Sequence, residues 1–119
     1  MRSALRITPV ALALLLAGGL LGCARDADPG ARVFRKRCSA CHGIDGRGRT
    51  RFAEGRPYAD LTDGRWRHGP DRAAIRSLVA DGDPKSSMPP FADRLTPAEI
   101  DAVVDHVLKI AASPPEAKP

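Results

Sequence analysis

The sequence predicts a helical domain with three helices joined by two loops. Each helix is marked by a start signal and by apolar residues at helical spacing behind it. The expected helices cover residues 30–37, 70–80 and 97–111. The first loop, residues 43–69, contains six glycines. A loop of that length is uncommon in a small domain unless it has a function.

The first and third helices have the clearest start signals. Asp28 precedes a proline, so a capping side chain is followed by the residue best suited to a first helical position. Thr96 and Glu99 are spaced as a capping box, and Leu95 and Ile100 as a hydrophobic staple. The third helix then presents one apolar face, made of Ile100, Val103, Val104, Val107, Leu108 and Ala111.

The second helix is expected to open at Pro70 and to stop at Gly82. Its apolar residues fall at positions i, i+3 and i+4: Ile75, Leu78 and Val79. A proline-rich loop, residues 83–91, follows it and contains Met88. No repeats are present, and the length of 119 residues indicates a single domain.

The N-terminus predicts export. Residues 1–22 are typical of a lipoprotein signal peptide, with Arg2 and Arg6 before an apolar run that ends in Leu-Leu-Gly. Cys23 is then the expected lipidation site, and residues 23–29 a tether to the folded domain, residues 30–111. The alternative is an uncleaved signal anchor. Either reading places the domain outside the cytoplasm, with lipidation anchoring it to the periplasmic side of a bacterial membrane. Residues 112–119 are expected to be a disordered tail.

Charge gives a weaker indication. The formal net charge is +5, of which two units would leave with Arg2 and Arg6. The remaining arginines are spread along the chain and alternate with aspartates, which is typical of a solvated surface. No basic patch with aromatic context is evident, so the sequence does not favour nucleic acid as a partner.

The motif that carries the chemistry is Cys-Ser-Ala-Cys-His, residues 38–42. This is the attachment signature of a c-type haem. Cys38 and Cys41 lie on one turn and can form thioethers to the two vinyl groups, while His42 reaches the iron from the proximal side. One covalent haem c would also supply apolar surface that so small a core lacks.

Two other uses of this cysteine pair remain open at this point. A thioredoxin-like redox pair would need a preceding strand and a helix continuing from the cysteines, whereas glycines follow here. A zinc site would need further ligands at metal spacing, and His68 and His106 are distant in the sequence.

A haem iron bound by His42 has a second axial position, for which Met88 is the candidate. It is the one methionine left after signal cleavage, and it lies in a loop stiffened by prolines instead of on a helix stripe. Core packing is the alternative role of a lone methionine. His68, in a loop beside Trp66, is the competing ligand. His106 falls away from the apolar stripe of its helix and is expected at the rim or exposed.

From about residue 30 to residue 110 the chain resembles a class I cytochrome c. The resemblance is carried by CSACHG, then DLT with Trp66 and Gly69, then MPPF at residues 88–91, then the helix that begins at Leu95-Thr96. It implies an all-α cytochrome c fold of three main helices around the haem, with the N- and C-terminal helices crossing. It also implies that His42 and Met88 are the axial ligands.

The resemblance suggests further contacts to the haem. Pro57 or its neighbourhood would orient His42 through a backbone carbonyl, and Leu61 and Phe91 would pack on the ring. Trp66 and Arg56 are candidate partners of the propionates. The chain departs from the family at His106, because an aromatic usually stands there and packs against the N-terminal helix near Gly30 and Phe34. His106 therefore puts that helix contact in doubt and raises the hypothesis of a pH-sensitive interface.

The expected function is electron transfer, not catalysis. A six-coordinate iron leaves no open site, so no small-molecule substrate is expected, and the partners would be redox proteins. Arg47, Arg49 and Arg51 follow the motif and could steer an acidic partner or be merely solvated. A haem-based sensor or peroxidase with a displaceable Met88, and a periplasmic disulfide oxidoreductase, remain as alternatives.

Overall fold

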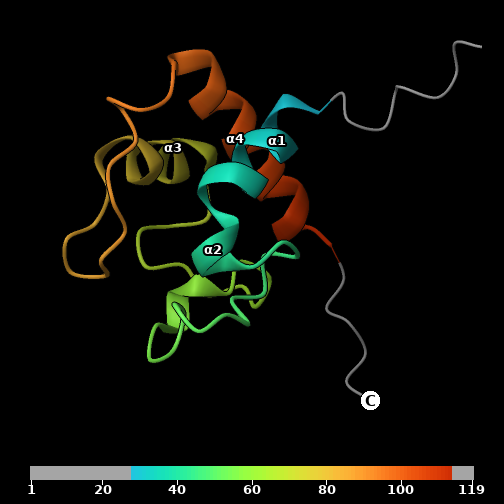
Figure 1. The fold of residues 1–119 in the computed structure, drawn as a ribbon, viewed down its shortest axis with the longest axis vertical. Coiled ribbons are helices and arrows are strands. Elements are labelled where there is room, and N and C mark those ends of the chain that lie inside the picture. Colours follow the sequence, from blue (N-terminus) through green and yellow to red (C-terminus); the bar gives the residue numbers. More distant parts are fainter. Residues whose placement is uncertain (1–27, 114–119) are drawn as a thin grey trace, which may run out of the picture.

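The computed structural model describes residues 28–113, which form helices joined by long loops (Figure 1). The elements are α1 (Pro29–Arg37), α2 (Ser39–His42), the 3-10 turn η3 (Pro57–Ala59), α3 (Arg72–Asp81) and α4 (Pro97–Ala111). Within this range no strand forms, and the extended pairing is an isolated bridge between Asp83 and Met88. The predicted all-α fold with three main helices is therefore confirmed.

Several predictions from the sequence lie outside the described residues. They are the signal peptide at residues 1–22, lipidation at Cys23, the tether up to residue 27 and the tail beyond residue 113. None of the helices between residues 28 and 113 is both long enough and apolar enough to cross a bilayer.

Helix α1 begins at the predicted cap and ends at the haem motif. The Asp28 carboxylate accepts hydrogen bonds from the backbone N–H groups of Gly30 (2.9 Å) and Ala31 (3.2 Å). At Cys38 the backbone departs from helical geometry (φ −116°, ψ −34°), and the single turn α2 continues from there. The two cysteines and His42 are thus presented on one turn directly after α1.

Helix α4 begins with the predicted capping box. The Thr96 hydroxyl accepts a hydrogen bond from the backbone N–H of Glu99 (3.2 Å), and the Glu99 carboxylate accepts one from the N–H of Thr96 (2.9 Å). Both staple residues, Leu95 and Ile100, are buried. These contacts fix where the helix starts and therefore which of its faces meets α1.

Helices α1 and α4 cross closely, and the core lies where α3 joins them (Figure 1). At the crossing, a Cβ on Gly30 would overlap the carbonyl oxygen of Ala102, so the two backbones touch only because Gly30 has no side chain. The most deeply buried side chains are Phe34, Val103 and Val104, each no more than 2% exposed. Burial of each stabilises the fold by about 1.5–3 kcal/mol.

Helix α3 starts later than predicted. Asp71, not a residue before Pro70, is the N-cap, because its carboxylate accepts a hydrogen bond from the N–H of Ala74 (3.0 Å). The helix ends at Gly82 as expected. On its solvent side Arg76 pairs with Asp101 (2.8 Å), which links α3 to α4. Ile75 and Val79 of the predicted stripe enter the core.

Candidate functional site

A cleft of about 340 Å³ opens between α2, η3 and the two loops that flank α3. All eight residues predicted to bind a cofactor line it, although they come from four separate segments: Cys38, Cys41, His42, Pro57, Leu61, Trp66, Met88 and Phe91. Their individual roles toward a haem stay predictions. Their convergence on one cavity is what those roles require.

Both cysteines of the motif are free thiols that line the cleft. Burial of Cys38, with a smaller contribution from neighbouring Cys41, raises its pKa to about 11. Reactive redox cysteines have lowered pKa values because the thiolate is the nucleophile. The environment of Cys38 therefore argues against the disulfide oxidoreductase alternative and suits a half-buried attachment point.

His42 is oriented by a backbone carbonyl. Its Nδ1–H donates a hydrogen bond to the carbonyl oxygen of Ala59 (2.8 Å), which fixes the proton on Nδ1 and leaves Nε2 with a free lone pair. Burial lowers the pKa of His42, which favours the neutral ring that can ligate a metal. The acceptor was expected at Pro57 or nearby. It is Ala59, two residues further on in the same 3-10 turn.

The approach of η3 to His42 depends on a glycine. Gly48 has a φ of +64°, and a Cβ there would lie 2.8 Å from the carbonyl carbon of Ala59. The Gly48 N–H also donates to the carbonyl oxygen of His42 (2.7 Å). Gly48 thus holds the haem motif and the supporting carbonyl together, which explains one glycine of the long loop.

Met88 reaches the cleft from the loop after α3. Asp83 and Met88 exchange two backbone hydrogen bonds, Asp83 N–H to Met88 O (2.9 Å) and Met88 N–H to Asp83 O (3.2 Å). These bonds close a tight loop with Met88 at its end. The side chain is partly buried and packs against the edge of the core. The sequence placed Met88 in an irregular loop, as observed.

His68, the competing ligand, and His106 both have contacts elsewhere. His68 lines the cleft, but its Nε2 atom lies 2.9 Å from Asp83 Oδ2. His106 is not part of the cleft lining, and its ring packs against Phe34 of α1. Of the two expected positions for His106, exposed or at a rim, the structure favours the second, because the α1–α4 crossing leaves the side chain half-buried. The same contact preserves the helix packing that His106 had put in doubt.

Sequence reasoning missed other residues of the cleft. Leu78 was assigned to the core stripe of α3, yet it lines the cleft while its neighbours face the core. The i, i+3, i+4 spacing placed Leu78 on the same face as Ile75 and Val79, so the sequence offered no signal that separates it from them. The basic side chains at the cleft were also missed, apart from Arg56. The basic lining as a whole consists of Arg37, Arg56, Arg65, Arg67 and Lys85, set against the single carboxylate of Asp83.

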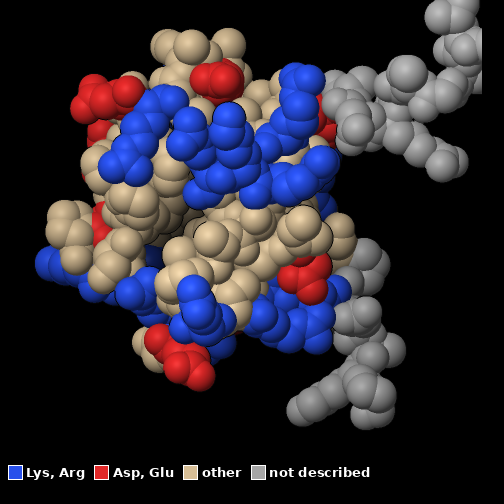
Figure 2. All heavy atoms as spheres, in the orientation of Figure 1, with Lys and Arg blue, Asp and Glu red and all other residues tan. Residues whose placement is uncertain are grey.

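The arginines expected to steer partners lie outside this lining. Arg49 pairs with Asp45 (3.0 Å), and Arg51 lies over the exposed ring of Phe52 at 4.7 Å from its centroid. Figure 2 instead shows a band of Lys and Arg side chains across the region of α1, whose last turn contains Arg35, Lys36 and Arg37. Positive charge therefore gathers nearest the start of the haem motif.

The donor set suits a haem c and not a zinc ion. Two thiols stand beside a neutral imidazole, a thioether reaches the same cavity, and Leu61, Leu78 and Phe91 supply apolar surface. Among residues 28–113, no three side chains of His, Cys, Asp or Glu are grouped so as to hold a metal ion. The observed fold has no strand in this range to form a thioredoxin-like unit.

Comparison with known proteins gives one family. The sequence-family model described as "Cytochrome C oxidase, cbb3-type, subunit III" matches residues 25–107 of this chain. The cbb3-type cytochrome c oxidase subunit FixP of Azorhizobium caulinodans is 34% identical over 92 residues, covering 77% of this chain and 30% of FixP. Cytochrome c6 of Gloeothece citriformis is 35% identical over 108 residues, covering 88% of this chain and 93% of the relative.

Solved structures agree. The KustC0563 c-type cytochrome superimposes with a TM-score of 0.59 at 31% identity, covering 68% of this chain and 95% of that one. A chain of the Kuenenia stuttgartiensis reducing HAO-like protein complex gives a TM-score of 0.60 at 29% identity, covering 71% and 41%. This chain spans about a third or less of the cbb3-type relatives it matches, but nearly all of cytochrome c6 and of KustC0563.

Proposed function

The chain belongs to the class I cytochrome c family, and from this premise we propose that it carries one covalent haem c and passes single electrons between redox proteins. Membership of this family implies electron transfer and a haem c. That there is one haem, and that the chain works at the periplasmic face of a bacterial membrane, are parts of the proposal. It would act as a shuttle or as the electron-transfer subunit of an oxidoreductase.

The observation that carries the proposal is the support of His42. Its Nδ1–H is committed to the Ala59 carbonyl, so Nε2 is the nitrogen available for iron. Cys38 and Cys41 would form the thioethers, and Met88 would be the second axial ligand. The haem would supply the one-electron change between ferric and ferrous iron.

The residues around the cleft would favour the ferrous state of a bound haem. The Met88 thioether is a soft ligand, and apolar walls penalise the additional positive charge of ferric iron. The basic side chains act in the same direction. We therefore expect a positive midpoint potential against hydrogen. With His42 and Met88 both bound to the iron, no site would be left for a substrate, which supports an electron carrier over a peroxidase.

The proposed location of the domain and the proposed kind of partner rest on separate features of the chain. A lipid on Cys23 would keep the domain at a membrane surface, with the tether ending before Asp28 and Pro29, because these two residues already form the start of α1. The cleft has five basic residues in its lining and one acidic residue, so its mouth would attract a redox partner with an acidic docking surface. This assigns steering to the residues of the cleft instead of Arg47, Arg49 and Arg51.

The test is expression in a host with haem-maturation machinery. A denaturing gel stained for peroxidatic activity should show colour at the mass of the chain, because a covalent haem survives denaturation. The variant with both Cys38→Ser and Cys41→Ser should give no stained band. A colourless parent protein would refute the proposal, and the disulfide oxidoreductase alternative predicts that outcome.

A spectrum of the oxidised protein then separates carrier from sensor. Met–iron bonding gives an absorption band at about 695 nm. The band should be present in the parent protein and absent from Met88→Leu. Without it in the parent, the haem-based sensor or peroxidase would be the better description.

A further inference from the structure

The one buried charged side chain among the described residues lies at the base of the Met88 loop. Asp83 is 6% exposed and begins the tight loop that its backbone bonds to Met88 close. A buried carboxylate is unfavourable unless it is fully paired. Its partners therefore indicate what this charge holds in place.

The two oxygens of Asp83 have different partners. Oδ1 accepts a hydrogen bond from the backbone N–H of Lys85 (3.0 Å), within its own loop. Oδ2 lies 2.9 Å from Nε2 of His68 and 3.1 Å from Nε of Arg67. Oδ1 thus stabilises the turn within the Met88 loop, and Oδ2 connects that loop to the segment that follows Trp66.

The contact between Asp83 and Arg67 also reaches the segment that holds His42, the other proposed axial ligand. The Arg67 guanidinium lies over the ring of Tyr58, 5.8 Å from its centroid. Tyr58 belongs to η3, whose residue Ala59 holds His42. Through Arg67, Asp83 connects the segments that present both axial ligands.

The Met88 loop needs such restraint because it contains an unfavourable residue. Ser87, immediately before Met88, has a φ of +62° and is the one non-glycine residue with positive φ among those described. A side chain in this region is disfavoured and persists where the surrounding structure fixes it. Without restraint, the loop would relax at the residue next to the ligand.

We propose that Asp83 is a positioning residue that holds Met88 in the cleft. It does so by fastening the base of the Met88 loop to Arg67 and His68. The inference rests on the proposed His42/Met88 ligation. Loss of the fastening would leave Met88 detached for a larger fraction of time, so that a small added ligand would compete with it more effectively.

The Asp83→Asn variant tests the inter-loop contact with little other change. Asparagine can keep the acceptor for the Lys85 N–H while directing an N–H donor at Arg67. We expect the band at about 695 nm to weaken. We also expect the affinity of the oxidised holoprotein for added imidazole to rise about tenfold or more, since a hydrogen bond to a charged group is lost. Arg67→Gln should act in the same direction, with the combined variant less than additive.

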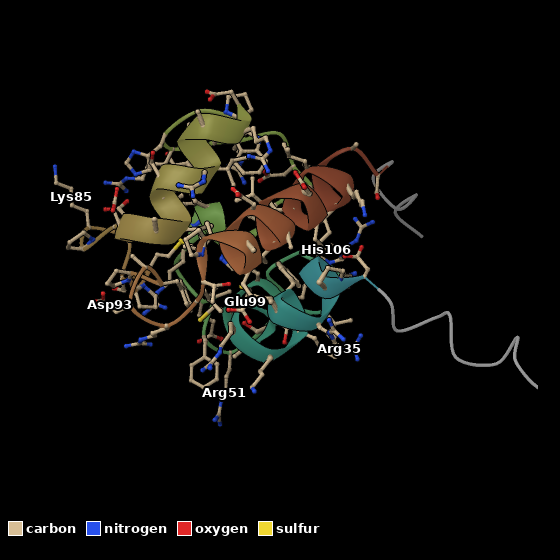
Figure 3. The ribbon with its side chains drawn as sticks, turned by 90° about the horizontal axis from the view of Figure 1, so that it is seen from above. Arg35, Arg51, Lys85, Asp93, Glu99 and His106 are labelled. Carbon is tan, nitrogen blue, oxygen red and sulfur yellow. The ribbon has the colours of Figure 1, made fainter. Side chains whose placement is uncertain are left out.

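Two controls separate positioning from loss of charge or of stability. Asp93→Asn removes the same charge from an exposed position between the Met88 loop and α4 (Figure 3), and it should leave the band and the imidazole affinity unchanged. Val104→Ala weakens the core outside the cleft and should lower the unfolding midpoint without changing imidazole affinity. If both Asp83→Asn and Arg67→Gln match Asp93→Asn in the two readouts, the inference is overturned.

The same measurements distinguish this inference from the function on which it rests. A parent protein without the band would contradict Met88 ligation itself, and the Asp83 role with it. A parent with the band and unaffected variants would contradict the Asp83 role alone. If Asp83→Asn does not mature with haem, Arg67→Gln decides the question, because it leaves the carboxylate and its turn in place.

Discussion

His106 of α4, labelled in Figure 3, lies against Phe34 of α1, and the two ring centroids are 5.2 Å apart with the ring planes tilted by 54°. The His106 side chain is only 20% exposed, and its Nδ1 atom is buried without a hydrogen-bond partner. The nearest acidic oxygen, Oδ2 of Asp28, is 3.8 Å from it. The helix crossing therefore keeps a ring-to-ring contact while burying an unsatisfied polar atom.

Replacing His106 by phenylalanine should stabilise the protein. Phe keeps a planar ring against Phe34 and removes the buried nitrogen, whose burial without a partner costs about 1–3 kcal/mol. We expect the free energy of unfolding to rise by about 1 kcal/mol, measured by denaturant titration of the holoprotein. His106→Ala, which loses the ring as well, should be less stable than the parent. A His106→Phe variant less stable than the parent would show that Nδ1 is satisfied in solution.

Gly30 should tolerate no side chain. An added Cβ would overlap Ala102 O and lie 2.8 Å from the Ala102 carbonyl carbon, and backbone cannot rotate away as a side chain can. Gly30→Ala should therefore lower the free energy of unfolding by about 1–3 kcal/mol or more, although alanine favours helix.

The matched control for this prediction is Gly55→Ala. Gly55 has a φ of +71° and no atom within 4 Å of an added Cβ, so only its backbone preference is violated. It should cost about 1 kcal/mol. Equal losses at the two sites would mean that α1 and α4 do not cross as closely as described.

Features that depend on neighbouring residues could be predicted from the sequence, whereas contacts between distant segments could not. Local signals were reliable: the cap at Asp28, the capping box at Thr96 and the stop at Gly82 depend on neighbours within four residues, and each is observed. The family resemblance, not periodicity, brought Pro57, Leu61 and Phe91 to one site. The start of α3 was misplaced because a proline and a cap residue stood side by side at positions 70 and 71.

The errors that remain are tertiary. The position of His106 on its helix suggested an exposed or rim side chain, and its half-buried place against Phe34 depends on the approach of α1, which no local pattern reports. Ala59 offers a carbonyl that any residue would offer, so only the fold could identify it as the partner of His42. Nothing in the sequence singled out Asp83, and its burial appears only when Arg67 and His68 are folded onto it.

Acid should weaken the contact between α4 and the start of α1. The hydrogen bond from Lys109 (3.0 Å) and those of the helix cap hold the pKa of Asp28 below its ordinary value of 3.8. A lowered folded-state pKa means that the contribution to stability is complete above 3.8 and is lost as the pH falls through the lower value. Asp28→Asn keeps a good N-cap but lacks the charge.

Asp28→Asn should therefore have a lower free energy of unfolding than the parent at about pH 6, and this difference should be smaller at about pH 2.5. Unfolding midpoints at the two pH values measure it, and Lys109→Gln should reproduce the pattern. A difference that grows on acidification would mean that the sign of the linkage is wrong.

Charge at the cleft should govern how fast small redox ions react. Arg37 and Lys85 line the cleft and are exposed, whereas Arg32 and Arg94 are exposed basic residues outside its lining. The pair Arg37→Gln and Lys85→Gln should slow oxidation of the reduced holoprotein by ferricyanide about threefold to tenfold at low ionic strength, because an anion is steered by the local field. Oxidation by a cationic ruthenium ammine should become faster instead.

The control pair Arg32→Gln and Arg94→Gln removes the same total charge. If it slows oxidation by ferricyanide less than the cleft pair does, the position of the charge matters and not only the net charge. Stopped-flow rates of the two variants should converge as salt is raised, since screening shortens the range of the field to a few ångströms. Equal slowing by both pairs would assign the effect to net charge. In that case the basic cleft would carry no information about the partner, and the docking surface would have to be sought elsewhere on the domain.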